Sequence, residues 1–295
     1  MKRIIRVGSR DSVLAVKQAQ IVMDAVKRND SSVEFELVKI KTTGDKLLDR
    51  SLVTAGGKGL FIKELEKALA DLRIDIAVHS YKDMPCEEAD DLPIAALSER
   101  ESPFDALVLP LGHDSIDKTK PAGSSSLRRT IQFLNLYKGL EVKPIRGNVP
   151  GRLSKLDNGE YGALILAHAG LIRLGLQNRV TRVFTVDEMI PSASQGILAV
   201  QGRKGEDYSY LAPFHNRESD IVSKAERRFI KTIGGGCSSP AAVYARINNN
   251  EILLTGLYAD ADGHIEKGEI SGDIDKSEML GETLAVRLKE RAESK

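Results

Sequence analysis

The first hundred residues alternate between the two periodicities of hydrophobic positions that distinguish strands from helices. Apolar residues recur every three or four positions from Val13 to Val26, behind Ser12, a residue type that caps helix N-termini. A second helical pattern opens at Gly59. The order strand, helix, strand, helix, strand predicts a parallel sheet covered by helices. The predicted strands are residues 4–7, 34–41 and 74–79.

A second α/β pattern begins after the composition changes near residues 99–103. The predicted strands are residues 106–109, 142–145 and 163–167, and the predicted helices are residues 126–137, 149–158 and 171–174. One further strand, residues 197–201, is expected to return to the first domain.

Beyond Phe214 the pattern predicts a small α+β domain, with a turn at residues 248–250 between two of its strands. Its predicted helices are residues 218–232 and 277–291, and its predicted strands are residues 242–247, 252–259 and 265–270. The chain has 295 residues, of which 41% are hydrophobic, so more than one core is expected. The domain boundaries that follow are 1–98 with 196–214, 102–192, and 217–295.

Composition narrows the possible partners and compartments. The 43 basic and 42 acidic side chains almost cancel, which argues against nucleic acid or an anionic membrane as partner. The apolar run after the basic start is too short for a signal peptide, and no run reaches the ~20 residues of a membrane span. The two cysteines, Cys86 and Cys237, lack metal-ligand spacing. We expect a cytoplasmic monomer without a structural disulfide or a metal site.

Charge is nevertheless unevenly distributed along the chain. Residues 120–182 contain eleven Lys or Arg and three Asp or Glu, whereas residues 83–119 contain ten acidic and two basic residues. A basic segment in a near-neutral protein indicates either a localised anion site or a solvated basic face. Charge alone leaves both interpretations open.

The positions of the basic residues favour a site. Arg10, Arg146 and Arg173 each follow a predicted strand, and Arg128 and Arg129 open a predicted helix. In open α/β sheets, ligands bind outside the carboxyl ends of strands, where helix N-termini also offer free N–H groups. Arginine adds a planar fork that grips carboxylates. We expect a ligand with several carboxylates or phosphates. No phosphate-binding GxxxxGK[ST] or GxGxxG motif is present, so a nucleotide enzyme is poorly supported.

Two further residues carry candidate chemistry. Asp83 follows a predicted strand in HSYKDMP (79–85); it is either a pre-proline turn residue or a carboxylate that stabilises a developing cation. Cys237 follows three glycines in GGGCSSP (234–240), which favours a presented thiol, such as a tether, over a buried hydrophobe. His79 is expected to pack at its strand end. Cys86 lies among acidic residues that should raise its pKa, and we expect it to be incidental.

Together these segments resemble the porphobilinogen deaminases, also called hydroxymethylbilane synthases. The resemblance runs from Arg6 to about Ala245 and is weaker beyond. Its most specific segments are VGSRDS–LA (7–15), GGKGLFIKELE (56–66), DIAVHSYKDMP (75–85), SSLRR (125–129), RGNV–GRL (146–153), LDNGEYGALILA (156–167) and GGGCSSP.

The resemblance implies two domains similar to type II periplasmic binding proteins and a small α+β C-terminal domain. It implies a dipyrromethane cofactor joined to Cys237 by a thioether, and Asp83 as the catalytic carboxylate. The implied cofactor contacts are Lys82, Ser80, Ser124, Ser126, Arg128, Arg129 and Arg146. The implied substrate-side residues are Arg10, Ser12, Gln18, Lys58, Arg152, Arg173 and Gln195.

The resemblance also implies the reaction. Four molecules of porphobilinogen, each with two carboxylates, lose ammonia and are added in turn to the dipyrromethane primer. Hydrolysis then releases a linear tetrapyrrole, hydroxymethylbilane. Asp83 would stabilise the azafulvenium cation left by ammonia. No metal or nucleotide is implied.

Two alternatives from a different class stay open. A cytoplasmic polycarboxylate-binding module of periplasmic-binding-protein type would need no Cys237, and a polycarboxylate sensor would release no ammonia. Some positions depart from the family pattern: Ser194 replaces a glycine before Gln195-Gly196, Thr54 replaces a lysine, and Ser238-Ser239 replaces Gln-Val.

Overall fold

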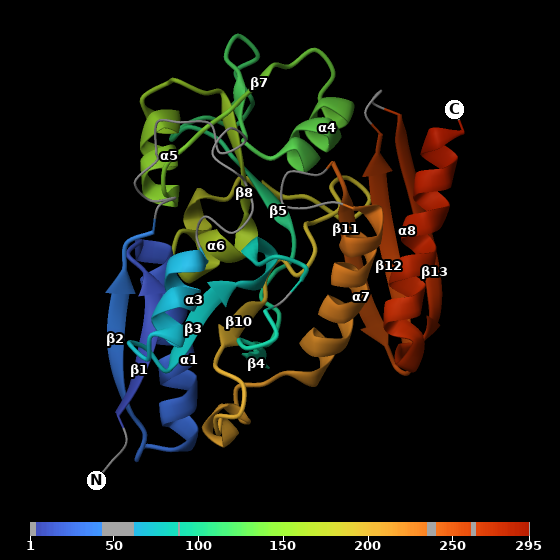
Figure 1. The fold of residues 1–295 in the computed structure, drawn as a ribbon. Helices are drawn as coiled ribbons and strands as arrows, with labels where there is room; N and C mark the ends of the chain where they lie inside the picture. Colours follow the sequence, from blue (N-terminus) through green and yellow to red (C-terminus); the bar gives the residue numbers. More distant parts are fainter. Residues whose placement is uncertain (1–3, 43–61, 88, 235–239, 261–263, 295) are drawn as a thin grey trace. The chain divides into compact units, whose positions relative to one another are not determined.

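The computed structural model describes residues 4–42, 62–87, 89–234, 240–260 and 264–294. The chain divides into two compact units (Figure 1). The first is Met1–Arg100 with Ile197–Asp220, and the second is Glu101–Gly196 with Ile221–Lys295. The boundary predicted between residues 102–192 and 217–295 falls inside the second unit, so the three-domain division stays a prediction.

The first unit is built on a five-stranded mixed sheet of order β2-β1-β3-β10-β4. Its parallel strands are β1 (Ile4–Arg10), β2 (Glu34–Ile40) and β3 (Ile76–Ser80). Strand β10 (Leu198–Gln201) runs antiparallel between β3 and β4 (Ile94–Leu97). The predicted return of residues 197–201 to this domain is confirmed. The three strands predicted to form a parallel sheet are parallel, and the returning strand adds an antiparallel member to them.

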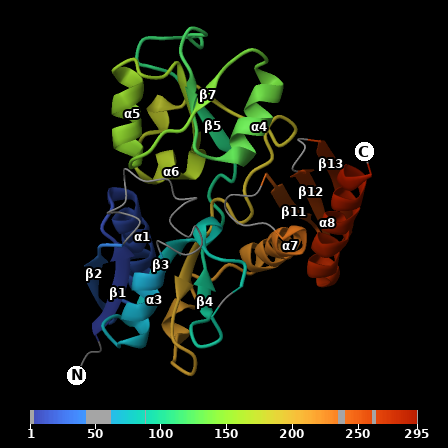
Figure 2. The ribbon, with the colours of Figure 1, turned by 45° about the horizontal axis from the view of Figure 1, so that its top comes forward.

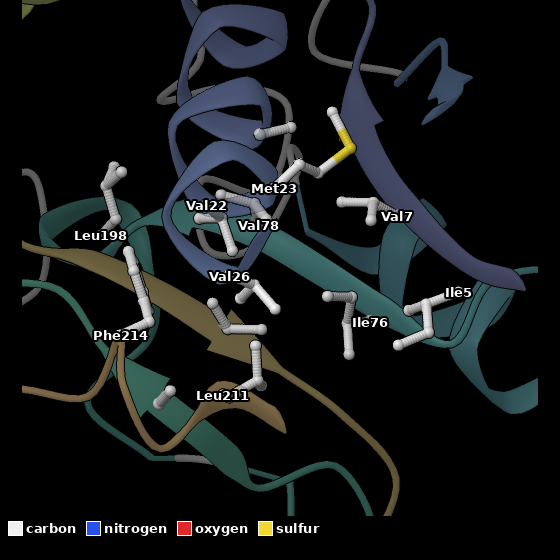
Figure 3. Packing of buried hydrophobic residues seen from close by; sticks show 13 residues of the cluster. Ile5, Val7, Val22, Met23, Val26, Ile76, Val78, Leu198, Leu211 and Phe214 are labelled. Carbon is white, nitrogen blue, oxygen red and sulfur yellow. The ribbon is translucent and has the colours of Figure 1, made fainter. Parts of the chain in front are cut away.

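Helices cover both faces of this sheet. Helix α1 (Val13–Asn29) begins where predicted, with the Ser12 hydroxyl accepting a hydrogen bond from the Ala15 N–H. Its buried side chains, among them Val22 and Val26, pack against Val78 and other strand residues (Figure 3). Helix α3 (Lys63–Ala70) lies against the opposite face through its own leucines. The start predicted at Gly59 lies outside the described residues.

The second unit contains another five-stranded mixed sheet, of order β7-β6-β8-β5-β9. Strand β6 (Ala122–Gly123) runs parallel to β7 (Val142–Lys143) and β8 (Ala163–Ala167). Strand β5 (Asp105–Val108) runs antiparallel between β8 and β9 (Arg182–Val183). In each sheet three neighbouring strands are parallel, and one antiparallel strand lies between them and an edge strand. The two sheets therefore share one arrangement of parallel and antiparallel strands.

Alternating side chains of β8 reach helices on both faces. Ala163 and Ile165 pack with Phe133 of α4 (Leu127–Leu136), whereas Leu164 and Leu166 pack with the leucines of α5 (Val149–Asp157). Figure 2 shows α4 and α5 on opposite sides of this sheet. Helix α6 (His168–Arg173) directly follows β8. Helices on both faces bury the whole strand, which explains the uninterrupted apolar run ALILA.

The C-terminal part is the expected α+β arrangement. Strands β11 (Ala242–Asn248), β12 (Glu251–Ala259) and β13 (Ile265–Asp273) form an antiparallel sheet. Helices α7 (Arg217–Ile233) and α8 (Ser277–Glu293) share one face of it, since a Cβ at Gly256 would meet Phe229 and Leu284, both at 3.0 Å. The predicted turn is confirmed, with Asn249 at φ 57°. Within the described ranges, none of the helices has the length and apolarity needed to cross a membrane.

Candidate active site

Asp83 stands on a short, well-anchored turn at the end of β3. A single 3₁₀ turn (Tyr81–Asp83) follows the strand directly. Tyr81 and Met84 are buried on either side, and the Tyr81 N–H donates to the Ile197 carbonyl at 3.0 Å. Asp83 itself is exposed. The fold therefore presents this carboxylate to solvent on a backbone that its neighbours hold in place.

Other predicted residues of the first unit lie at the same edge of its sheet. Strands β1 and β3 are parallel neighbours. Arg10 ends β1, Ser12 caps the next helix, and Ser80 and Lys82 follow at the end of β3. Because carboxyl ends of neighbouring parallel strands meet at one edge, the topology gathers these residues with Asp83.

Gln18 has a partner within the protein. Its side chain is buried on α1, and its Nε2 donates to the Ser80 hydroxyl at 2.9 Å. The sequence predicted a substrate-side role for Gln18. The structure gives it a positioning contact with Ser80, a predicted cofactor ligand.

His79 is buried directly before these residues. Its Nε2 has no hydrogen-bond partner, and burial lowers its pKa to about 4, with the charge of Arg10 acting in the same direction. The side chain is therefore neutral at pH 7. This agrees with the predicted packing role.

In the second unit, three serines order the loop that enters α4. The Ser126 hydroxyl caps the helix by accepting from the Arg129 N–H at 3.5 Å. The Ser124 hydroxyl is buried and accepts from the Ser126 N–H at 3.2 Å. Ser125 exchanges two hydrogen bonds with the backbone of Ile145. The predicted contacts Ser124 and Ser126 thus fix the N-terminus of α4, where the free N–H groups favour anions.

Arg128 and Arg129, in the first turn of α4, are both buried and share one carboxylate. Arg128 Nη1 donates to Asp105 Oδ2 at 2.7 Å. Arg129 donates to Asp105 Oδ1 through Nε at 2.9 Å and through Nη2 at 2.7 Å. Burial by itself would raise the pKa of Asp105, but the two guanidinium charges hold it well below its usual range. Burial lowers the pKa of Arg128, and Asp105 opposes that shift.

Two guanidinium groups against one carboxylate leave one positive charge at the start of α4. Uncompensated buried charge is costly, so this group is suited to a further anionic partner. The structure thus fits a ligand whose carboxylates approach the helix N-terminus. Dipyrromethane, which carries several carboxylates, meets this requirement.

Gln195 joins the same cluster from the chain segment that leads into β10. Its Nε2 donates to Asp105 Oδ1 at 3.0 Å and to the Pro103 carbonyl at 2.7 Å. Five residues earlier, the Ile190 carbonyl accepts from Arg128 Nη1 at 2.8 Å. We call residues 190–196 the crossover segment. The Ile190 carbonyl at its start and the Gln195 side chain near its end both form hydrogen bonds with the arginine cluster, which consists of Asp105, Arg128 and Arg129.

Three further predicted arginines have different surroundings. Arg152 donates to the Gly147 carbonyl at 2.8 Å, where a φ of 110° requires glycine. Arg173 Nη2 donates to the Gly196 carbonyl at 2.5 Å, and burial lowers its pKa to about 10. Arg146 is half-buried between β7 and α5. Arg173 therefore contacts the crossover segment in the structure, where the sequence predicted a substrate contact.

Ser194 lies in the crossover segment at one of the departures from the family pattern. Its φ is 58°, in the left-handed region that favours glycine. Its hydroxyl is buried without a hydrogen-bond partner. Its N–H donates at 2.6 Å to Glu226 of α7, whose other oxygen accepts from the Ala245 N–H at 2.6 Å. The buried Glu226 carboxylate thus links the crossover segment to α7 and β11.

Several predicted residues lie outside the described residues, namely Lys58, Cys237, Thr54, Ser238 and Ser239. Asp83 belongs to the first unit, and the arginines of α4 belong to the second. Among the residues that the structure describes, no cluster of His, Cys, Asp or Glu could hold a metal ion. Cys86 is half-buried.

Sequence reasoning missed Asp105 and Glu226. Asp105 carries a detectable signal, because an acidic residue heads the otherwise apolar run DALVLP. Buried aspartates are rare unless paired, so a partner could have been expected there. Glu226 carries no such signal, since it stands between Ala225 and two arginines on a charged helix.

Comparison with known proteins adds relatives over nearly the whole chain. The family model described as "Porphobilinogen deaminase, dipyromethane cofactor binding domain" matches residues 5–210, and that of the "Porphobilinogen deaminase, C-terminal domain" matches residues 221–290. The porphobilinogen deaminase of Acetivibrio thermocellus is 55% identical over 98% of this chain and 99% of its own length. That of Alkaliphilus oremlandii is 52% identical over 97% and 96%, respectively.

The solved structures that are similar to this chain share little sequence with it. The BenM effector binding domain with benzoate is 13% identical, with a TM-score of 0.42 over 72% of this chain and 88% of that one. The methionine-binding protein MetQ is 12% identical, with a TM-score of 0.45 over the same shares. The two family models and the full-length relatives, by contrast, decide the assignment: the chain belongs to the porphobilinogen deaminase family.

Proposed function

We propose that this protein is a hydroxymethylbilane synthase, which joins four porphobilinogen molecules on a covalent dipyrromethane primer and releases the linear tetrapyrrole. As a member of its family it is a transferase of porphyrin biosynthesis with a small-molecule substrate. The observation that carries the proposal is the pair of buried arginines that share Asp105 at the start of α4. This pair supplies the positive charge that an oligomer of acidic pyrroles requires.

The arginines are proposed to neutralise carboxylates as the chain grows. Each porphobilinogen adds two carboxylates, so a product of four units needs many cationic contacts. Arg128 and Arg129 are preordered by Asp105, and their helix N-terminus adds N–H donors. Arg10, Arg146, Arg152 and Arg173 are proposed to bind further acetate and propionate groups. Arg173 would exchange its bond to the Gly196 carbonyl for a substrate carboxylate.

Asp83 is proposed to be the catalytic residue. Loss of ammonia from the aminomethyl group leaves a cation on the substrate, which a fixed carboxylate stabilises. The free α-position of the bound chain attacks this cation and then loses its proton, which the same carboxylate can accept. Its exposure on an anchored turn suits both tasks, because it is accessible yet held in place.

The primer is proposed to be held by Cys237 through a thioether. Dipyrromethane, when bound, supplies the free α-position to which the first substrate is added. Its carboxylates are proposed to meet Ser80, Lys82, Ser124, Ser126, Arg128, Arg129 and Arg146. Gln18 would act by orienting the Ser80 hydroxyl, and Ser12, Lys58 and Gln195 would lie on the substrate side.

Replacing the proposed catalytic carboxylate tests this function. We expect Asp83→Ala to slow ammonia release from porphobilinogen by about 10²–10⁴-fold, because the cation and the proton lose their partner. The variant should still carry its covalent pyrroles, measured by intact mass spectrometry. Asp90→Ala removes a nearby exposed carboxylate and should turn over normally. Normal turnover by Asp83→Ala would remove Asp83 from the mechanism.

The alternative of a polycarboxylate-binding module is not favoured, because family models of the enzyme match both parts of the chain. We further propose that the enzyme works as a monomer in the cytoplasm. Light scattering should then give a mass near 32.2 kDa for the chain, plus the primer. A mass twice that value would contradict the monomer.

A further inference from the structure

Asp105 is a carboxylate of the second unit with several hydrogen-bond donors around it. It is fully buried at the start of β5, opposite Ala167 at the carboxyl end of β8. Its oxygens accept four hydrogen bonds, three from Arg128 and Arg129 and one from Gln195. A carboxylate accepts about four in total, so its capacity is used.

The donors come from two distant stretches of the chain. The arginines are 23 and 24 residues from Asp105, and Gln195 is 90 residues away. Arg128 also reaches the Ile190 carbonyl, so both ends of the crossover segment meet this cluster. A single side chain thereby fixes the orientation of two guanidinium groups and the course of the segment that leads into β10.

We infer that Asp105 is a positioning residue of the anion site: it holds Arg128 and Arg129 in the orientation that ligand carboxylates need and ties them, through Gln195, to the crossover segment. The inference rests on the proposed function. Asp105 is fully buried, and its four hydrogen bonds come from Arg128, Arg129 and Gln195, so it acts through these side chains and not on the ligand.

Position in the sheet distinguishes this role from ordinary stabilisation. Asp105 lies at the carboxyl end of β8, the edge at which α/β sheets bind ligands. A chemically similar group lies in the first sheet, at the amino end of a parallel strand. There Asp75 pairs with Arg6 at 2.9 Å and Arg203 at 3.4 Å, immediately before the start of β3. Asp75 is thus a matched control, a buried carboxylate between two arginines that is placed away from the ligand edge.

The test follows assembly of the holoenzyme. Full-length apoprotein, produced in cells that make no porphobilinogen, is mixed with porphobilinogen, and the gain of covalent pyrrole is timed by intact mass spectrometry. The proteins compared are the wild type, Asp105→Asn, Asp105→Glu and Asp75→Asn. Thermal midpoints and circular dichroism measure the folded fraction of each.

We expect Asp105→Asn to assemble at least roughly tenfold more slowly per folded molecule, because misoriented arginines lose contact with the pyrrole carboxylates. Its KM for porphobilinogen, after assembly, should rise more than kcat falls. Asp105→Glu keeps the charge and should assemble faster than Asp105→Asn. Asp75→Asn should lose thermal stability yet assemble at the wild-type rate.

Wild-type assembly by Asp105→Asn would overturn the inference. So would equal slowing of Asp105→Asn and Asp75→Asn in proportion to their folded fractions, since that is the mark of a purely structural residue. Failure of the wild type to gain any pyrrole would instead contradict the proposed function, so the two failures are distinguishable.

Discussion

Ser194 occupies a backbone conformation that disfavours its side chain. An L-residue at φ 58° costs about 1–2 kcal/mol, and the buried hydroxyl without a partner adds a desolvation cost. The N–H that donates to Glu226 is present in any residue but proline, so glycine would keep this contact.

We therefore expect Ser194→Gly to raise the free energy of unfolding by about 1 kcal/mol, after allowing for the greater freedom of glycine in the unfolded chain. Urea unfolding measures the change. Asn249→Gly is the control, because Asn249 has the same φ in an exposed turn and asparagine tolerates it, so its gain should be smaller. A less stable Ser194→Gly protein would contradict this account of the residue.

The lowered pKa of His79 predicts that the free energy of unfolding depends on pH. Its folded pKa of about 4 lies below its ordinary value of 6.5, so the unfolded chain takes up a proton more readily between these values. The folded state should lose about 3 kcal/mol as pH falls from 6.5 to 4. We expect His79→Gln to show a shallower loss in urea unfolding at pH 7 and pH 4.5.

A nuclear magnetic resonance titration provides the direct check. The His79 imidazole should stay neutral down to about pH 5. A midpoint near 6.5 would show that the side chain is hydrated in solution. Asp105 and Asp75 affect stability at lower pH. Because their pKa values are lower in the folded protein, they contribute stability that is present above about pH 3.9 and is lost as the pH falls further.

The positions of the arginines were predictable from the sequence, but their partners were not. Each follows a strand or opens a helix, and that is a local signal. The pairing of Arg128 with Asp105 depends on how β5 and α4 lie in the folded unit. The contact of Gln18 with Ser80 likewise crosses 62 positions of sequence. Pairings of this kind are set by tertiary structure.

At the scale of elements, the crossing of α7 and α8 depends on one glycine. A Cβ at Gly281 would lie 2.2 Å from the Ala225 carbonyl oxygen, so the helices would have to separate. Alanine favours the helix by about 1 kcal/mol relative to glycine. Any loss of stability in a glycine-to-alanine variant at this position therefore comes from packing.

We expect Gly281→Ala to lower the free energy of unfolding by about 1–3 kcal/mol despite its higher helix propensity. Gly151→Ala in α5 is the control, because its new Cβ would meet only the Asn148 side-chain oxygen, at 3.1 Å. Thermal unfolding of the two variants compares them. An unchanged or raised midpoint for Gly281→Ala would show that the helices adjust without cost.

The long elements were predictable because each shows several repeats of its period. Helix α1, helix α8 and strands β11 and β12 lie close to their predicted bounds. Strands β6 and β9 have two residues each and were missed, since two residues carry no period. Strand β4 was missed for a similar reason, at four residues. The antiparallel direction of β10 was also unpredictable, because a strand's direction depends on where the chain enters the sheet.

At the scale of the whole molecule, two sheets with the same arrangement of parallel and antiparallel strands carry different chemistry. The edge of the first presents a carboxylate on a fixed turn, and the edge of the second presents paired arginines at a helix N-terminus. A sequence with balanced total charge thus concentrates positive charge in one unit. Within the second unit, Glu226 of α7 links the crossover segment to the C-terminal sheet.

The central claim is that the protein carries covalent pyrroles as the primer of its own reaction. Intact mass spectrometry of the freshly purified chain tests it most directly. The account predicts a mass above that of the sequence by two linked pyrrole units, and the unmodified mass for Cys237→Ser. A wild-type mass equal to that of the sequence, in material produced where porphobilinogen is available, would contradict it.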